Sequence, residues 1–267
     1  MVKMLNIAAI QFEPEFLDMN INRKKIENLI TKTISENNSE LIVLPELSFS
    51  GYNFKNLDQV KMTSEKIPDS ESCKLLEKLS RRYKVFIVAG INEQSEKKYY
   101  NTAVIYGPSG FITKYRKLQL YYREKKFFTP GNLPLQIFEL NGYRVGIMIC
   151  FDWFFPEIPR TLALNGADII CHIMNAVIPD GAYIGDTYYS KWNRIFIILA
   201  NRIGKEDDLE FIGRSVIIDN TGKILKQASN NQEEILSCQI EPNLARNKKL
   251  NEYNDVIKDR RIEFYRL

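Results

Sequence analysis

The stretch Val145-Gly-Ile-Met-Ile-Cys150-Phe-Asp-Trp-Phe-Phe-Pro-Glu157 carries an unbroken apolar run into a single cysteine, after which aromatic and polar residues follow. A strand buried on both faces of a parallel sheet reads as such a continuous apolar run. In open α/β sheets the ligand site lies at the carboxyl ends of the strands. Cys150 therefore stands where an α/β fold places a nucleophile, although a free cysteine in an apolar setting is also commonly an inert buried thiol.

The composition of the 267-residue chain, with 45% hydrophobic and 26% charged residues, is that of an ordinary folded protein. We expect one domain spanning residues 1–267, in which residues 243–267 form a C-terminal tail without a clean hydrophobic period. The net charge of +4 is small beside 37 basic and 33 acidic residues, and the basic clusters are short and scattered. We therefore predict no nucleic-acid partner.

The sequence also argues against a membrane partner and against an oxidising compartment. The longest apolar run, 195–200, is far shorter than the ~20 residues that span a bilayer. The N-terminal apolar stretch is interrupted at Gln11 and Glu13 before a signal-peptide core is complete. Four cysteines without a C-x-x-C pair indicate neither a zinc ribbon nor a disulfide framework, so we expect a cytoplasmic protein.

Strand and helix signals alternate along most of the chain, which predicts an α/β fold. The alternation covers residues 5–11, 22–36, 41–44, 70–83, 85–89, 101–106, 111–115, 145–149, 156–165, 169–173, 183–193, 195–200, 215–219 and 234–239. The turn Gly107-Pro-Ser-Gly110 predicts a hairpin, so antiparallel pairing enters and the sheet is mixed. The irregular stretch 117–134 is long enough to suggest a functional loop.

Two further strand ends carry groups that could serve a cysteine nucleophile. The apolar run 41–44 leads through a proline to Glu46, whose partial desolvation would raise its pKa toward the range of a general base, although a surface glutamate would look similar. Lys117 follows the second strand of the hairpin and, taken alone, is interpreted as a solvated lysine. The single histidine, His172, lies in an apolar strand and is interpreted as structural, so a cysteine–histidine pair is not favoured.

Taken together, Glu46, Lys117 and Cys150 occur in the order and context of a Glu-Lys-Cys triad, and the chain resembles the nitrilase (carbon–nitrogen hydrolase) superfamily. The resemblance covers nearly the whole chain and rests on the segments 8–12, 44–46, 101–103, 115–117, 150–157, 201–204 and 211–215. It implies a four-layer α-β-β-α sandwich with two mixed sheets, and a homodimer or higher homo-oligomer in which the tail reaches over the partner. It also implies that neither a metal nor an organic cofactor is needed.

The resemblance further implies roles for particular residues. Glu46 would accept the thiol proton of Cys150, and Lys117 with the backbone N–H of Phe151 would stabilise the oxyanion. Glu124, in the loop after the lysine, would hold that lysine and position the substrate. The expected substrate-binding residues are Tyr52, Phe151, Asp152, Trp153 and Asn175.

The expected activity is hydrolysis of a non-peptide C–N bond in a small linear amide or N-carbamoyl amine, through a thioester and with release of ammonia or amine. One alternative is a nitrilase acting on a small aliphatic nitrile, and another is an inactive family member that serves as a binding module. Phe151-Asp152 stands where family nitrilases often have Trp-Glu, which favours amides. Gln119 and the segment 189–193 depart from common family patterns, so the sequence leaves the substrate open.

Overall fold

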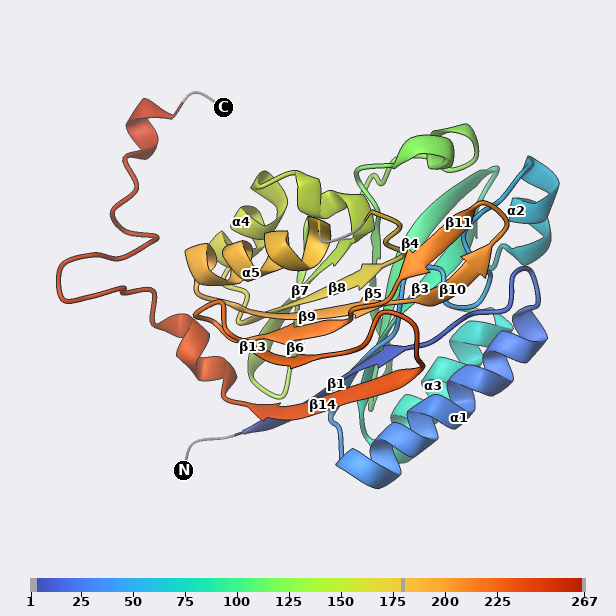
Figure 1. The fold of residues 1–267 in the computed structure, drawn as a ribbon, viewed down its shortest axis with the longest axis horizontal. Coiled ribbons are helices and arrows are strands. Elements are labelled where there is room, and N and C mark those ends of the chain that lie inside the picture. The colour runs from blue at the N-terminus through green and yellow to red at the C-terminus, as the bar shows by residue number, and fades with distance from the viewer. Residues whose placement is uncertain (1–3, 179–180, 266–267) are drawn as a thin grey trace.

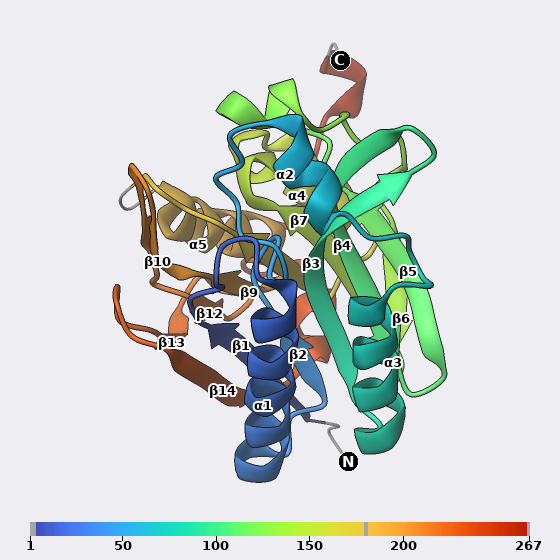
Figure 2. The same ribbon diagram turned by 90° about the vertical axis from the view of Figure 1, so that its right-hand side faces the viewer.

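Two six-stranded mixed sheets lie face to face at the centre of the protein, and helices cover the outer face of each sheet (Figure 1, Figure 2). The computed structural model describes residues 4–178 and 181–265. The layers follow the order helix, sheet, sheet, helix. The predicted four-layer α-β-β-α sandwich is therefore confirmed.

The first sheet has the strand order β14-β1-β2-β3-β4-β5. Its β1–β2 and β2–β3 pairs are parallel, and its other pairs are antiparallel. The strands are β1 (Leu5–Gln11), β2 (Leu41–Val43), β3 (Phe86–Ser95), β4 (Lys98–Gly107), β5 (Gly110–Arg116) and β14 (Glu234–Ile240). Helices α1 (Met19–Asn37) and α3 (Glu71–Tyr83) pack on the outer face of this sheet, as Figure 2 shows.

The second sheet has the strand order β13-β12-β9-β8-β7-β6, and its β7–β8 and β8–β9 pairs are parallel. Its strands are β6 (Ile137–Leu140), β7 (Tyr143–Ile149), β8 (Ile169–Met174), β9 (Phe196–Asn201), β12 (Val216–Ile218) and β13 (Ile224–Gln227). Helices α4 (Glu157–Leu164) and α5 (Gly181–Asn193) cover its outer face (Figure 1). A separate hairpin of β10 (Ile203–Glu206) and β11 (Leu209–Ile212) follows β9.

The alternation of side chains along a strand explains how one sheet serves two cores. Leu41 and Val43 of β2 belong to the buried cluster between the sheets, whereas Ile42 between them belongs to the cluster under α1 and α3. Successive side chains of a strand point to opposite faces, so a strand that is apolar on both faces can bury both. Ile26 of α1 completes the outer cluster.

Helix boundaries follow the capping residues. The side chain of Asp18 accepts hydrogen bonds from the backbone N–H groups of Asn20 and Ile21, so α1 begins at Met19, earlier than the predicted start at residue 22. Ser70 caps α3 in the same way. Cap side chains satisfy backbone donors that have no partner inside the helix.

Several short elements were not predicted: α2 (Leu57–Thr63), β6, β13 and the β10–β11 hairpin. β6 and β7 are joined through Asn141-Gly142, where both residues have positive φ (51° and 88°), which is typical of a tight hairpin turn. The predicted irregular stretch 117–134 contains one short helical turn, η1 (Tyr122–Lys126). The elements predicted over residues 5–116 and 145–240 all occur; most of their ends shift by a few residues, but β3 continues to Ser95, well past the predicted end at residue 89.

The predicted C-terminal tail leaves the body of the protein, as the red trace in Figure 1 shows. It contains the short turns η3 (Pro242–Arg246) and η4 (Ile262–Phe264), and its residues 266–267 lie outside the described part of the chain. Within residues 4–178 and 181–265, no helix combines the length and apolar character required to cross a bilayer.

Candidate active site

The predicted catalytic residues come from the ends of strands in both sheets. Glu46 follows β2, Lys117 comes directly after β5, Cys150 comes directly after β7, and Asn175 comes directly after β8. These strands end at the same edge of the sandwich, so side chains that are far apart in the sequence meet there. The structure brings Glu46, Lys117 and Glu124 into direct contact.

Lys117 is the centre of this buried cluster. Its Nζ donates to Glu46 Oε1 at 2.7 Å and to Glu124 Oε1 at 2.8 Å, and the three side chains are 0–4% exposed. Burial alone would lower the pKa of Lys117, but electrostatic interaction with the Cys150 thiol group, Glu124 and Glu46 raises it well above its ordinary value. Lys117 is therefore a fixed cation that holds two carboxylates.

Asn101, at the start of the buried part of β4, completes the cluster and was not among the predicted site residues. Its Nδ2 donates to Glu46 Oε1 at 2.6 Å and lies 3.4 Å from Glu124 Oε1. Its backbone carbonyl accepts from the N–H of Lys117 at 2.8 Å. Asn101 thus fixes both the side chain of Glu46 and the backbone of Lys117. Asn101 belongs to the segment 101–103 on which the family resemblance rests, but the spacing of that segment assigns no role to Asn101.

The two carboxylate oxygens of Glu46 have different surroundings. While Oε1 accepts from Lys117 and Asn101, Oε2 is buried and has no hydrogen-bond partner in the described part of the chain. A buried acceptor without a partner carries a cost of about 1–3 kcal/mol unless a ligand or reacting group completes it. The free oxygen is therefore available to take a proton.

Close backbone packing sets the position of Glu46. A Cβ added at Gly90 of β3 would lie 2.2 Å from the N atom of Leu47 and 2.6 Å from the Cα of Glu46. The N–H of Gly90 donates to the carbonyl of Pro45 at 3.1 Å. Only glycine allows the two backbones to approach this closely.

Cys150 begins the short helical turn η2 (Cys150–Phe154) with a positive φ of 44°, a conformation that is uncommon for residues other than glycine. The side chain is buried yet lines a cavity. Burial and the charge of Glu46 raise the pKa of the thiol well above its ordinary value, and Lys117 acts in the opposite direction. The raised pKa favours the protonated form of the thiol.

Asp152, predicted to bind substrate, does not line the cavity. Its carboxylate is fully buried and accepts from the hydroxyl of Tyr115 at 2.8 Å, from the N–H of Ile149 at 3.0 Å and from the N–H of Gln119 at 3.0 Å. These contacts join the end of β7 to the segment after Lys117. Asp152 therefore links the segment that carries Cys150 to the segment that carries Lys117.

Tyr52 lies close to the cluster. Burial, and then electrostatic interaction with the neighbouring Glu124, Cys150 and Glu46, raises the pKa of its hydroxyl well above the ordinary value. The backbone N–H of Tyr52 donates to a carboxylate oxygen of Glu206 at 3.0 Å, and Glu206 forms a buried ion pair with Arg202. The unpredicted β10–β11 hairpin thus positions Tyr52.

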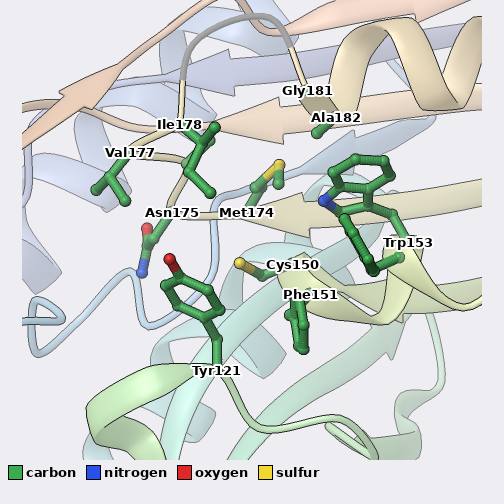
Figure 3. A pocket seen from close by; sticks show the side chains of 12 residues that line it. Tyr121, Cys150, Phe151, Trp153, Met174, Asn175, Val177, Ile178, Gly181 and Ala182 are labelled. Atoms are coloured by element: carbon green, nitrogen blue, oxygen red, sulfur yellow. The ribbon is translucent and has the colours of Figure 1, made fainter.

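A cavity of about 250 Å³ opens beside the sulfur of Cys150. Figure 3 shows the side chains of Tyr121, Asn175 and Trp153 around the space that Cys150 faces. The lining residues are Tyr121, Cys150, Phe151, Trp153, Phe154, Met174, Asn175, Ala176, Val177, Ile178, Gly181 and Ala182. A second cavity of about 140 Å³, which shares Tyr121 and Val177 with the first, is lined in part by Tyr52 and Glu124.

Of the predicted substrate-binding residues, Phe151, Trp153 and Asn175 line the first cavity and Tyr52 lines the second. Tyr121, which lines both, was not predicted. Its ring packs 5.1 Å from that of Phe151, and its N–H donates to Glu124 Oε2 at 2.8 Å.

Comparison with known proteins gives this site a family. The model of the carbon–nitrogen hydrolase family matches residues 6–249, and the chain belongs to that family. It is similar to a nitrilase of Pyrococcus abyssi (strain GE5 / Orsay), with 44% identity over 262 residues that cover 98% of this chain and 99% of that protein. The protein is a carbon–nitrogen hydrolase of the nitrilase superfamily.

More distant similarities agree with this assignment. An N-carbamoylputrescine amidase of Solanum lycopersicum is 25% identical over 290 residues, which cover 99% of this chain and 95% of that protein. The crystal structure of a carbon-nitrogen hydrolase from Helicobacter pylori G27 shares the fold, with a TM-score of 0.87 at 23% identity and coverage of 99% of this chain and 97% of that chain.

Proposed function

We propose that the protein hydrolyses a small, uncharged linear amide or N-carbamoyl amine through a thioester on Cys150, with release of ammonia or amine. The observation that carries the proposal is the geometry of Glu46. One of its oxygens is held by Lys117 and Asn101, and the other is buried without a partner in the described structure. A general base held in this way beside a protonated thiol is the arrangement that thiol activation needs.

In the first half of the reaction, Glu46 takes the proton of the Cys150 thiol as sulfur attacks the carbonyl carbon. The developing oxyanion is stabilised by the fixed charge of Lys117 and by the backbone N–H of Phe151. One such donor is typically worth about 10² to 10³ in rate. The tetrahedral intermediate collapses when protonated Glu46 gives its proton to the departing nitrogen, and the acyl group stays on sulfur.

In the second half, Glu46 removes a proton from a water molecule that attacks the thioester carbon. The acid product leaves and the thiol recovers its proton from Glu46, so the enzyme returns to its starting state. Glu124 supports both halves because it shares Lys117 with Glu46. The carboxamide of Asn175 is buried with neither polar atom partnered in the described structure, so it is suited to contact the substrate.

The cavity supports an uncharged, apolar acyl chain. None of its described lining residues carries a charged side chain, and its polar side-chain groups are those of Tyr121, Trp153, Asn175 and Cys150. A charged group buried there would lose its hydration without gaining a counter-ion. We therefore place uncharged amides and carbamoyl compounds above those that end in an ammonium or a carboxylate.

Nitrile hydrolysis is the second candidate, because the Pyrococcus abyssi relative at 44% identity is named a nitrilase. The same groups would serve it. Sulfur would add to the nitrile carbon, the thioimidate would take up water, and ammonia would leave to give the same thioester. An inactive binding module is disfavoured, because the four groups of the predicted machinery are all present and arranged around one site.

We also propose that the tail mediates homodimerisation. Its large apolar side chains are exposed: Leu250, Tyr253, Ile262, Phe264 and Tyr265. Light scattering of the full chain and of a chain that ends at residue 247 would test this, with a dimer expected for the first and a monomer for the second. Four free cysteines support a reducing location such as the cytoplasm.

Ammonia release from a substrate panel tests the proposed function. The panel pairs pentanamide with 5-aminopentanamide, propylurea with N-carbamoylputrescine, and pentanenitrile with 5-aminopentanenitrile. We expect turnover of an uncharged amide or urea, at least tenfold faster than that of its charged counterpart, and no turnover by Cys150→Ala. Turnover of the nitrile alone would select the second candidate, and preference for the charged members would refute the proposed substrate class.

A further inference from the structure

The single histidine of the chain lies directly behind the nucleophile. His172 belongs to β8, and its Nε2 is 3.2 Å from the carbonyl oxygen of Cys150. Its Nδ1 is 2.7 Å from Asp186 Oδ2, and Asp186 belongs to α5. Both side chains are fully buried. The sequence predicted a structural histidine, but its contact with the backbone of Cys150 suggests a more specific role.

The chemistry of the two partners determines where the proton on His172 lies. A backbone carbonyl only accepts hydrogen bonds, so the contact with Cys150 requires a proton on Nε2. The contact with Asp186 then requires a second proton, either on Nδ1 or on the carboxyl group. A neutral imidazole with its proton on Nδ1 would set the Nε2 lone pair against the carbonyl oxygen, which is unfavourable.

The electrostatics of the site agree with a retained proton. Burial alone would lower the pKa of His172, but the charge and hydrogen bond of Asp186, together with the Cys150 carbonyl and the charge of Asp152, raise it above the ordinary value. Burial raises the pKa of Asp186, which also favours keeping the shared proton. His172 therefore presents a donor to the Cys150 carbonyl.

The peptide between Cys150 and Phe151 carries this contact into the active site. In a trans peptide the C=O and the following N–H lie in one plane and point in opposite directions. A donor that holds the Cys150 carbonyl on one side therefore fixes the direction of the Phe151 N–H on the other. Because Cys150 has a positive φ of 44°, this peptide lies in a backbone conformation that needs such support.

We propose that His172, held by Asp186, is a positioning residue for the oxyanion donor: it anchors the Cys150–Phe151 peptide so that the Phe151 N–H faces the reacting carbonyl oxygen. This inference rests on the proposed function, in which that N–H stabilises the oxyanion. Asp186 lies one turn beyond Gly181 and Ala182, which line the cavity, so the same contact also ties α5 to the nucleophile.

Two variants of the full-length protein, each with a side-chain amide in place of the His172 imidazole, test the proposal. Glutamine at position 172 places an amide nitrogen near the position of Nε2, whereas asparagine reaches only the position of Nδ1. We expect His172→Asn to lower kcat by about 10- to 100-fold at unchanged KM, since misaligning a donor costs up to its full value of about 10² to 10³. We expect His172→Gln to stay within about fivefold of wild type.

A second readout separates positioning from general damage. Methyl methanethiosulfonate reacts with a thiol without forming an oxyanion, so its rate of reaction with Cys150 should change less than threefold in both variants. The proposal is overturned if His172→Asn keeps wild-type kcat, if His172→Gln falls as far as His172→Asn, or if the thiol reaction slows in step with kcat.

Two further outcomes are covered by the design. If His172→Asn does not fold, Asp186→Asn and Asp186→Leu are compared instead. Asparagine at position 186 can donate to Nδ1 of His172 and so leave the proton on Nε2, whereas leucine cannot. Equal kcat values in these two variants would refute the positioning role of His172. If wild type releases no ammonia from any substrate, the proposed function fails. The amide ¹⁵N shift of Phe151 then tests the anchor, with a change expected in His172→Asn and little in His172→Gln.

Discussion

Replacing Lys117 with methionine removes the buried cation that Glu46 and Glu124 share. The Nζ lies 2.7 and 2.8 Å from the two carboxylate oxygens, and all three side chains are 0–4% exposed. At an effective dielectric constant of about 20, unit charges at such distances attract by about 6 kcal/mol each before desolvation is counted. Removing one partner of a buried ion pair typically costs about 3–5 kcal/mol, and we expect that loss of unfolding free energy at pH 8.

The loss should shrink as the pH falls. Burial and the neighbouring Glu46 already raise the pKa of Glu124, and Lys117 opposes the rise. Without Lys117, the pKa of the Glu124 carboxyl in the folded state rises further above its value in the unfolded chain. In the pH range between these two pKa values, the folded state therefore binds more protons than the unfolded state. Stability then falls as the pH rises through the window between the unfolded and the folded pKa. We expect the variant to lie within about 1–2 kcal/mol of wild type at pH 5, where protonation removes most of the unpaired charge.

Urea unfolding at pH 5 and pH 8, followed by tryptophan fluorescence, measures both values. The double variant Lys117→Met/Glu124→Gln is the matched control, because it leaves one carboxylate without a like-charged neighbour and should recover about 1–2 kcal/mol at pH 8. A loss at pH 8 below 1 kcal/mol, or an equal loss at both pH values, would refute the electrostatic reasoning. Hydrolysis by the single variant should fall at least about 10²-fold, since a cationic oxyanion partner is lost.

Three other predictions follow from contacts around the site. Gly90→Ala would force a Cβ to 2.2 Å from the N atom of Leu47, so thermal unfolding should show a loss of about 3 kcal/mol or more, with kcat reduced; unchanged stability would contradict the packing argument. Tyr115→Phe removes the buried hydroxyl that donates to Asp152 at 2.8 Å, and urea unfolding should show a loss of about 1–3 kcal/mol. Ile178→Asp adds a carboxylate to the cavity, and steady-state kinetics should show a KM about fivefold lower for 5-aminopentanamide and higher for pentanamide. A KM that moves equally for both substrates would show that Ile178 does not face the acyl chain.

The main elements and the three central residues could be predicted because each is signalled locally. Continuous apolar runs mark the strands before Glu46 and Cys150, and the Gly107–Gly110 turn marks the hairpin before Lys117. Each residue taken alone had an ordinary structural interpretation, and the resemblance to the family is what grouped the three into one predicted site.

The supporting contacts could not be predicted because they join residues far apart in sequence. Glu206 holds the N–H of Tyr52 across more than 150 positions, and the short strands of its hairpin carry too few residues for a clear period. Asp152 was predicted to bind substrate because it lies two residues after Cys150, the predicted nucleophile. Its carboxylate turns instead toward Tyr115, and only the three-dimensional structure shows that direction.

The Asn141-Gly142 turn shows a signal that was present in the sequence and was missed. Asn-Gly between two apolar stretches is a strong hairpin signal, and the structure forms β6 and β7 on its two sides. The sequence left the resting state of the Cys150 thiol undecided, because Lys117 and Glu46 have opposite effects. Burial decides the balance in favour of the protonated thiol.

Intact-mass spectrometry of the acyl-enzyme tests the central claim most directly. Wild type mixed with the best substrate of the panel and quenched in acid within milliseconds to seconds should gain the mass of the acyl group on one peptide, the one that contains Cys150. Cys150→Ala should gain no mass and release no ammonia. Product formed by Cys150→Ala at the wild-type rate, or an acyl group found on another residue, would contradict the account.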